Sequence, residues 1–325
     1  RGAGRRPGGA GRGARAVTVT AGRPDAGRVT ARRRSVSETA IEAFLVASAA
    51  VGILTTVGIV LVLLFQALAF FSEVSPVDYL TGTVWSANIK PYAFGVIPLV
   101  VSTLMIALIA IVIAVPLGLL AAVWLAEYAS PRTRNVVKPV LEILAGIPTI
   151  VYGFFAITVV TPFLQGTILP GLKGLSALAA GIVVGILVLP LIASLSEDAL
   201  RAVPRSLREG SMGLGATRFE TIRRVLFPAA LSGIAAAVIL ALSRAVGETM
   251  AVVLAAGTNP TLTFDPTQSV QTMTAFIVQT ALGDNPQDSL QFRSMFAVGA
   301  TLFAMTLALN LLSACIVRRF RNAYA

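Results

Sequence analysis

The sequence predicts an all-α integral membrane protein with six transmembrane helices and both termini in the cytoplasm. Hydrophobic residues make up 56% of the 325 residues and charged residues only 13%, whereas soluble domains are about a quarter charged. Several apolar runs exceed the roughly 18 residues that indicate a membrane span. The lysines and arginines are also divided very unequally among the loops between these runs.

The first 40 residues are predicted to form a basic, disordered cytoplasmic tail, and residues 41–325 the six-helix membrane domain. Ten of the 26 lysines and arginines fall in this tail. No aromatic side chain lies among them for base stacking, so contact with anionic lipid headgroups is favoured over nucleic-acid binding. The apolar stretch that follows is longer than the 7–15-residue core of a signal peptide and is expected to remain as an anchor.

The six apolar runs predict the spans, with Gly and Pro interrupting the third and the fourth. Membrane helices tolerate these residues better than soluble helices do. The expected spans are residues 41–71, 95–126, 139–161, 174–195, 229–256 and 294–317.

The distribution of cations predicts the orientation. With six spans, 22 of the 26 lysines and arginines lie on the side of the termini. The opposite side holds Lys90, Lys173 and Arg293, and Arg244 lies within a span. Because cytoplasmic loops carry the excess of positive charge, both termini are expected inside.

Several classes of function are disfavoured by the residues present. There is no histidine and only one cysteine, Cys315, which excludes a Cys/His zinc site and an intrachain disulfide. No G-x-x-x-x-G-K-[ST] string is present to cradle a nucleotide phosphate. The lack of an internal repeat and of coupling-ion ligands argues against a secondary transporter. A channel would not explain the longest cytoplasmic loop, and a membrane enzyme would need a metal-ligand cluster or a nucleophile beside a base.

The longest cytoplasmic loop, at about 196–228, predicts an amphipathic helix, a turn near Gly213 and Gly215, and a second helical stretch. A Glu209–Gly210–Ser211 string is followed by Gly215 and then by Pro228. This spacing resembles the "EAA" loop of ABC importer permeases, with small residues in place of the two alanines. A compact element of this kind can transmit force from a soluble ATPase to the membrane. An ordinary amphipathic interface helix is the alternative.

Arg244 and Glu248 place two charges in the fifth predicted span, followed directly by Thr249. A charge at mid-membrane costs roughly 2.5–3.5 kcal/mol. Four residues apart on one helix, the two side chains share a face and can pair. They are either a structural ion pair, or Arg244 meets an anion in a water-filled path and Glu248 positions it. Glu142 and Asn310 are weaker candidates.

The loop after the fifth span, at about 257–293, is rich in Asn, Thr, Pro and Gln. It is predicted to lie outside and to be long enough to receive a partner protein.

Three stretches resemble one family in order along the chain. The string RAVGETMAV at 244–252 resembles the phosphate-specific (Pst) permeases of the C type. The blocks at 92–129 and 142–153 also resemble that family, and the resemblance covers about residues 92–320. The GET triplet also occurs in the paired A-type subunit, whereas the Met-Ala-Val after it favours the C type.

This resemblance implies a type I ABC importer permease fold in the bacterial cytoplasmic (inner) membrane. It implies a heterodimer with a homologous permease, two ATPase subunits that hold ATP and magnesium, and an extracytoplasmic phosphate-binding protein, with no cofactor in this chain. The phosphate path would involve Arg244, Glu248 and Thr249. The ATPase contact would involve Glu209, Gly210, Ser211, Gly215 and Pro228. A permease for another oxyanion, such as sulfate or molybdate, is the nearest alternative.

We expect the purified chain alone to hydrolyse no ATP, because it lacks the phosphate-binding loop. A phosphate-release assay on the single subunit, with the reconstituted complex as positive control, checks this. Hydrolysis that persists after all ATPase subunits are removed would contradict it.

Overall fold

The structure, a computed structural model, describes residues 36–172 and 174–321, so residues 1–35 of the predicted tail lie outside the described part. The first helix, α1 (Val36–Phe71), begins within the last residues assigned to the tail. The described residues up to Thr56 belong to a separate unit. The packing described below is that of residues 57–321.

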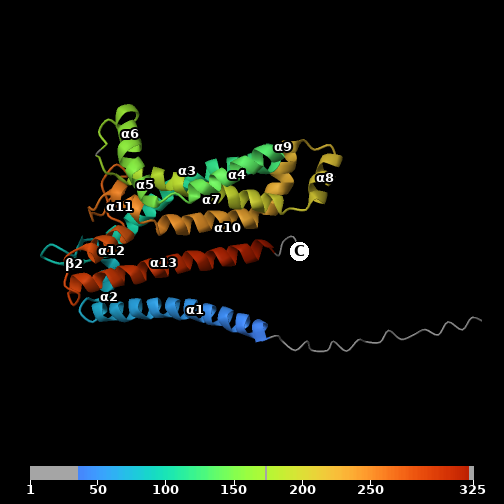
Figure 1. The fold of residues 1–325 in the computed structure, drawn as a ribbon. Helices are drawn as coiled ribbons and strands as arrows, with labels where there is room; N and C mark the ends of the chain where they lie inside the picture. The colour runs from blue at the N-terminus through green and yellow to red at the C-terminus, as the bar shows by residue number, and fades with distance from the viewer. Residues whose placement is uncertain (1–35, 173, 322–325) are drawn as a thin grey trace, which may run out of the picture. The chain divides into compact units, whose positions relative to one another are not determined.

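Six helical segments of the described residues are long and apolar enough to cross a membrane, which confirms the all-α class and the six spans (Figure 1). These are Ala40–Phe71, Ile97–Tyr128, Thr149–Thr167, Ala177–Arg201, Arg218–Val246 and Leu290–Cys315. The elements that form the last five are α3 (Ile97–Val123) with the π-helical turn η1 (Trp124–Tyr128); α5 (Thr149–Phe155), η2 (Ala156–Val160) and α6 (Thr161–Thr167); α7 (Ala177–Arg201); α9 (Arg218–Thr221), η3 (Ile222–Leu226) and α10 (Phe227–Val246); and α13 (Leu290–Arg321).

Shorter elements connect these spans. They are α2 (Pro76–Thr81), α4 (Pro131–Ala145), α8 (Arg205–Gly213), α11 (Met250–Ala256) and α12 (Met273–Leu282), with strand β1 (Trp85–Ser86) antiparallel to β2 (Ala93–Phe94).

The α3–α7 contact is the most extensive helix packing in the described part. Glycines allow the two backbones to approach closely. A Cβ atom added at Gly181 would lie 2.6 Å from the Ile109 side chain, and one added at Gly118 would lie 2.8 Å from Ile192. This seam forms the centre of the main buried apolar cluster.

The third span lies further along the chain than the expected 139–161, because the helix breaks between α4 and α5. Pro148 directly precedes α5. Proline has no N–H to donate within a helix, and it disfavours the helical conformation of the residue before it, so a helix tends to end there. The Tyr152 hydroxyl donates to the Leu144 carbonyl at 2.9 Å, which satisfies one group freed by the break. Glu142 therefore lies exposed near the end of α4 and does not begin the third span.

The fifth span ends at Val246 instead of continuing to 256. Gly247 ends α10, and α11 begins three residues later at Met250. We refer to residues 247–249 as the span-five break.

The segment 257–293, expected to be a polar loop, contains a buried helix. Its central part forms α12, whose Met273, Ala275 and Phe276 are buried. The Met273 N–H donates to the Thr103 hydroxyl of α3 at 3.1 Å. Apolar runs of 10–14 residues are typical of buried or re-entrant helices, and α12 is one of these.

We expect Gly185→Val to destabilise the subunit by about 1–3 kcal/mol, the usual cost of overpacking a filled core. A Cβ atom there would lie 3.0 Å from the Ala110 carbonyl oxygen, which is backbone and cannot swing away. The thermal midpoint in detergent measures the loss. Gly58→Val is the matched control, because a Cβ atom at Gly58 meets nothing within 4 Å. Equal midpoints for the two variants would contradict the proposed tightness of the seam.

Candidate functional site

The expected ion pair between Arg244 and Glu248 is absent from the structure. The two residues lie on either side of the end of α10, so their spacing is not one turn of a continuous helix. The side chain of Glu248 turns towards α11, where its Oε1 accepts a hydrogen bond from the Ala251 N–H at 3.3 Å. Glu248 lies just before Thr249, the N-cap residue of α11, and a carboxylate there is stabilised by the N–H groups that the first turn leaves without partners. Glu248 thus satisfies one N–H group at the start of α11 and is buried, with 7% of its surface exposed.

Arg244 lies in the last turn of α10 and is exposed. No described carboxylate forms an ion pair with it. The neighbouring Ser243 donates to the Asn310 side-chain oxygen at 3.1 Å, which joins α10 to α13. Asn310 is therefore a partner of Ser243 beside Arg244.

The span-five break is also held by α12. The Thr274 hydroxyl donates to the Glu248 carbonyl at 2.8 Å, and Thr274 is buried. The Thr249 hydroxyl donates to the Gly247 carbonyl at 3.1 Å, so Thr249 closes the turn locally. Thr274 was not among the predicted site residues, because it lies in the segment expected to be an outer loop. The apolar run of α12 was the available signal.

The loop after the fourth span has the predicted helix–turn–helix form, although α7 continues to Arg201 and so takes the first residues of the expected 196–228. α8 is followed by a turn in which Gly215 has φ +86°, a conformation that favours glycine. A capping box of Thr217 and Glu220 then begins α9. Pro228 lies in the first turn of α10, where proline is tolerated.

α8 is mostly exposed, and only Arg208 and Ser211 are partly covered. Glu209, Gly210 and the apolar side chains Met212 and Leu214 are exposed, and Leu214 is 92% exposed. Ser211 forms a hydrogen bond of 3.0 Å with the Thr221 hydroxyl, which joins α8 to α9. The loop therefore presents apolar side chains to its surroundings together with charged ones, among them Glu209, Glu220 and Arg218.

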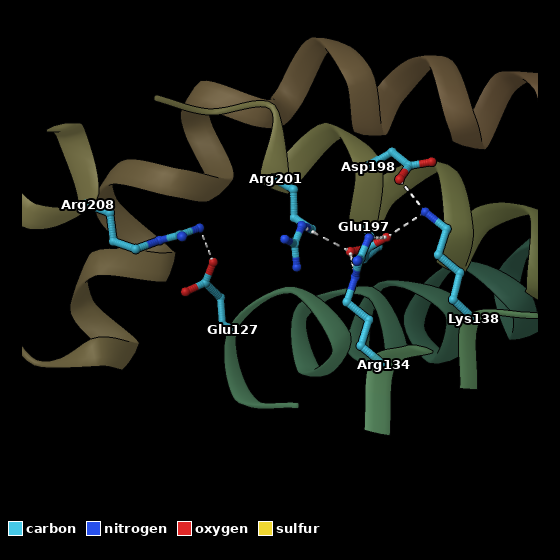
Figure 2. A network of polar contacts seen from close by, with 7 residues as sticks. All are labelled: Glu127, Arg134, Lys138, Glu197, Asp198, Arg201 and Arg208. Carbon is cyan, nitrogen blue, oxygen red and sulfur yellow. Dashed lines mark hydrogen bonds and ion pairs between the residues drawn. The ribbon is translucent and has the colours of Figure 1, made fainter. Parts of the chain in front are cut away.

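A buried carboxylate lies beside this loop, at Glu197 near the end of α7 (Figure 2). Its side chain is fully buried and accepts from Arg134 Nε at 2.7 Å and Lys138 Nζ at 2.9 Å, both on α4. Arg201 Nε lies 3.6 Å from the same carboxylate. Lys138 also pairs with the more exposed Asp198. We refer to these five residues as the Glu197 cluster.

The Glu197 cluster fastens α4 to α7 electrostatically. Burial lowers the pKa of Lys138, but its hydrogen bonds to Asp198 and Glu197 outweigh this effect, and the net pKa is raised. A raised pKa in the folded state stabilises the fold below the ordinary value, about 10.4, and this stabilisation is lost only as the pH rises beyond it. Lys138 therefore keeps its positive charge in this cluster at neutral pH. The described residues hold no group of three histidine, cysteine or carboxylate side chains suited to a metal.

Comparison with known proteins places this geometry among transport proteins. The family model described as "Binding-protein-dependent transport system inner membrane component" matches residues 114–322. The chain is 35% identical to the probable ABC transporter permease protein YqgH of Bacillus subtilis over 283 residues, 86% of this chain and 91% of that protein. It is 35% identical to the phosphate transport system permease protein PstC of Mesorhizobium japonicum over 284 residues, 80% of this chain and 84% of that protein.

The fold is similar to a solved bacterial ABC transporter involved in the import of the acidic polysaccharide alginate. The TM-score is 0.62, with 87% of this chain and 96% of that chain covered. At 14% identity, this likeness concerns the fold alone.

We expect Glu197→Ala to lower the free energy of unfolding by about 3–5 kcal/mol, because it leaves buried cations without their counter-charge. Asp198→Asn is the matched control: Asp198 is 55% exposed, and exposed pairs are worth about 0–1 kcal/mol. Thermal or denaturant unfolding in detergent measures both. A loss no larger for Glu197→Ala than for the control would contradict the central role of Glu197.

Proposed function

The chain belongs to the family of binding-protein-dependent transport system inner membrane components, and we propose that it is the C-type permease subunit of a phosphate importer. As a member of this family it is the membrane-spanning part of an ABC importer and not itself an enzyme. We propose further that both termini lie in the cytoplasm, in accord with the 22 of 26 cations assigned to that side.

The proposed path for the anion rests on one observation: the guanidinium of Arg244 forms no ion pair with a described carboxylate. A cation at membrane depth is costly unless it reaches water or an anion. Arg244 is exposed on the subunit by itself and has no carboxylate partner among the described residues. This face of α10 would line a path shared with a homologous second permease. Glu248 would act by holding the span-five break, and Thr249 by closing its turn.

Two considerations support phosphate as the anion, one from the chemistry of arginine and one from a relative. The planar guanidinium can form two parallel hydrogen bonds with phosphate oxygens. The PstC relative of Mesorhizobium japonicum carries phosphate transport in its name. Sulfate and molybdate share the tetrahedral shape and the negative charge, and they remain the alternative substrates.

The exposed face of α8 would contact the ATPase. Glu209 and the apolar Met212 and Leu214 are free to enter a cleft on a partner protein. Two such ATPase subunits would bind ATP and magnesium in the cytoplasm, one at this subunit and one at the homologous permease. On the opposite side, an extracytoplasmic phosphate-binding protein would deliver the anion.

We expect Arg244→Lys to reduce phosphate uptake by the reconstituted importer about tenfold or more, which corresponds to about 1.4 kcal/mol or more of lost stabilisation. Lysine keeps the charge but loses the two-pronged hydrogen bonding. Arg293→Lys is the matched control, because Arg293 pairs with Glu73 elsewhere and lysine can keep that pair. Competition with sulfate and molybdate during the same uptake assay identifies the anion. Uptake by Arg244→Lys equal to that of the control would rule out a guanidinium contact.

We expect Gly215→Ala to reduce ATP-driven uptake while leaving the membrane helices folded, since alanine is strained at φ +86° by about 1–2 kcal/mol. Gly213→Ala is the control two residues away, where a Cβ atom meets nothing within 4 Å and φ is not positive. A cysteine at Glu209 should crosslink to the ATPase in the native importer. The absence of any such crosslink would remove the docking assignment.

A further inference from the structure

Glu127 carries a carboxylate in a position that the helix itself does not favour. It lies in η1, at the C-terminal end of the second span, Ile97–Tyr128. Negative charge is disfavoured at a helix C-terminus, where unpaired carbonyl groups gather. Its side chain is nonetheless only 6% exposed. A buried carboxylate at this end of a helix must be held by cations from elsewhere in the protein.

Those cations come from both arms of the loop that surrounds Gly215. Arg208 of α8 forms an ion pair with the Glu127 carboxylate (Figure 2). Arg218 of α9 donates to the Glu127 main-chain carbonyl at 3.5 Å. The guanidinium of Arg218 also lies 5.7 Å from the centre of the Tyr128 ring, within the range of a cation–π contact. The end of the second span is therefore held from two sides.

Two adjacent residues of α8, Arg208 and Glu209, have different surroundings. Glu209 is exposed, whereas Arg208, its neighbour, is half-buried and reaches Glu127. Successive residues of a helix point in directions about 100° apart. One residue thus faces outward from the subunit, and the next is anchored to a transmembrane helix.

A movement of the second span would be transmitted directly to the packed core of the subunit. The second span continues from η1 into α3, which packs against α7 along the glycine seam. Closely packed small residues leave no slack between these two helices. A displacement of α8 that pulled on Glu127 would therefore shift α3 with it.

We propose that Glu127 is the positioning residue through which the loop around Gly215, with α8 and α9 on its two sides, moves the second span during the transport cycle. Its carboxylate holds Arg208 and its main chain holds Arg218, so the loop and the end of the second span move as one body. The inference rests on the role proposed above for this loop as the ATPase contact.

The test measures whether α8 and α3 move together. Cys315 is the only cysteine in the sequence, so Cys315→Ser provides a background for labelling. Ser206→Cys on α8 and Val112→Cys on α3, both at exposed positions, carry spin labels in the whole importer in lipid nanodiscs. Pulsed electron paramagnetic resonance then gives the distance between the labels without nucleotide and with ATP. We expect a single narrow distribution that is the same in both states.

Glu127→Gln keeps the size of the side chain and removes its charge. We expect it to broaden the distance distribution and to abolish the stimulation of ATP hydrolysis by the binding protein, in a complex that still assembles. Glu73→Gln is the matched control, since it makes the same chemical change in the exposed pair with Arg293. Arg208→Gln applies the same test from the loop when the Glu127 variant fails to assemble. A merely structural defect lowers the amount of complex but leaves the distance in the surviving complex narrow.

A narrow distribution that survives both Glu127→Gln and Arg208→Gln overturns the inference. So does a distribution that is already broad in the native importer. The proposed role of the loop is judged separately, by the crosslink between Glu209→Cys and the ATPase. The distance measurement uses no phosphate, so a different transported anion would not alter its outcome.

Discussion

Every backbone polar group inside a membrane needs a partner from the protein, and this requirement fixes where the helices of this subunit can break. At the break before the third span, the Tyr152 hydroxyl satisfies the Leu144 carbonyl. At the span-five break, Thr274 satisfies the Glu248 carbonyl, and the Glu248 carboxylate accepts from Ala251. Because Thr274 comes from α12, the fifth span can end early only where this short helix folds back into the core.

Two buried carboxylates of the described residues are neutralised by cations, whereas Arg244 in the fifth span is not paired with a carboxylate. The carboxylates of Glu197 and Glu127 are both buried near the helix ends on one side of the subunit, and each is held by cations. Arg244, near the span-five break, has no described counter-charge. Ion pairs thus stabilise the helix ends beside the loop that is proposed to contact the ATPase. The guanidinium proposed to bind the substrate remains without a carboxylate partner.

Local chemistry made the six spans and the helix–turn–helix loop predictable. The apolar length of a span and the turn at Gly215 depend on neighbouring residues, so hydropathy and spacing suffice to find them. The early end of α10 depends on contacts with α12, which no local pattern records. Assuming one continuous helix therefore produced the wrong pairing of Arg244 with Glu248.

The contacts of Glu197 and Glu127 could not be predicted from the sequence, for a similar reason. Glu197 meets Arg134, which lies 63 residues away, and Glu127 meets Arg208, which lies 81 residues away. A carboxylate at the C-terminal end of a helix was the one available signal for Glu127, because such a position calls for a distant cation.

The α3–α7 seam also constrains the order in which the protein can be built. α3 precedes α7 by the whole of α4, α5 and α6, so during synthesis the second span enters the bilayer before its main partner exists. It contains no charged residue between Ile97 and Ala126, and lipid alone can solvate it in the meantime. Its glycine, Gly118, is then exposed to lipid until Ile192 arrives to cover it. The newly made subunit is therefore most open to wrong helix pairing in the interval between its second and fourth spans.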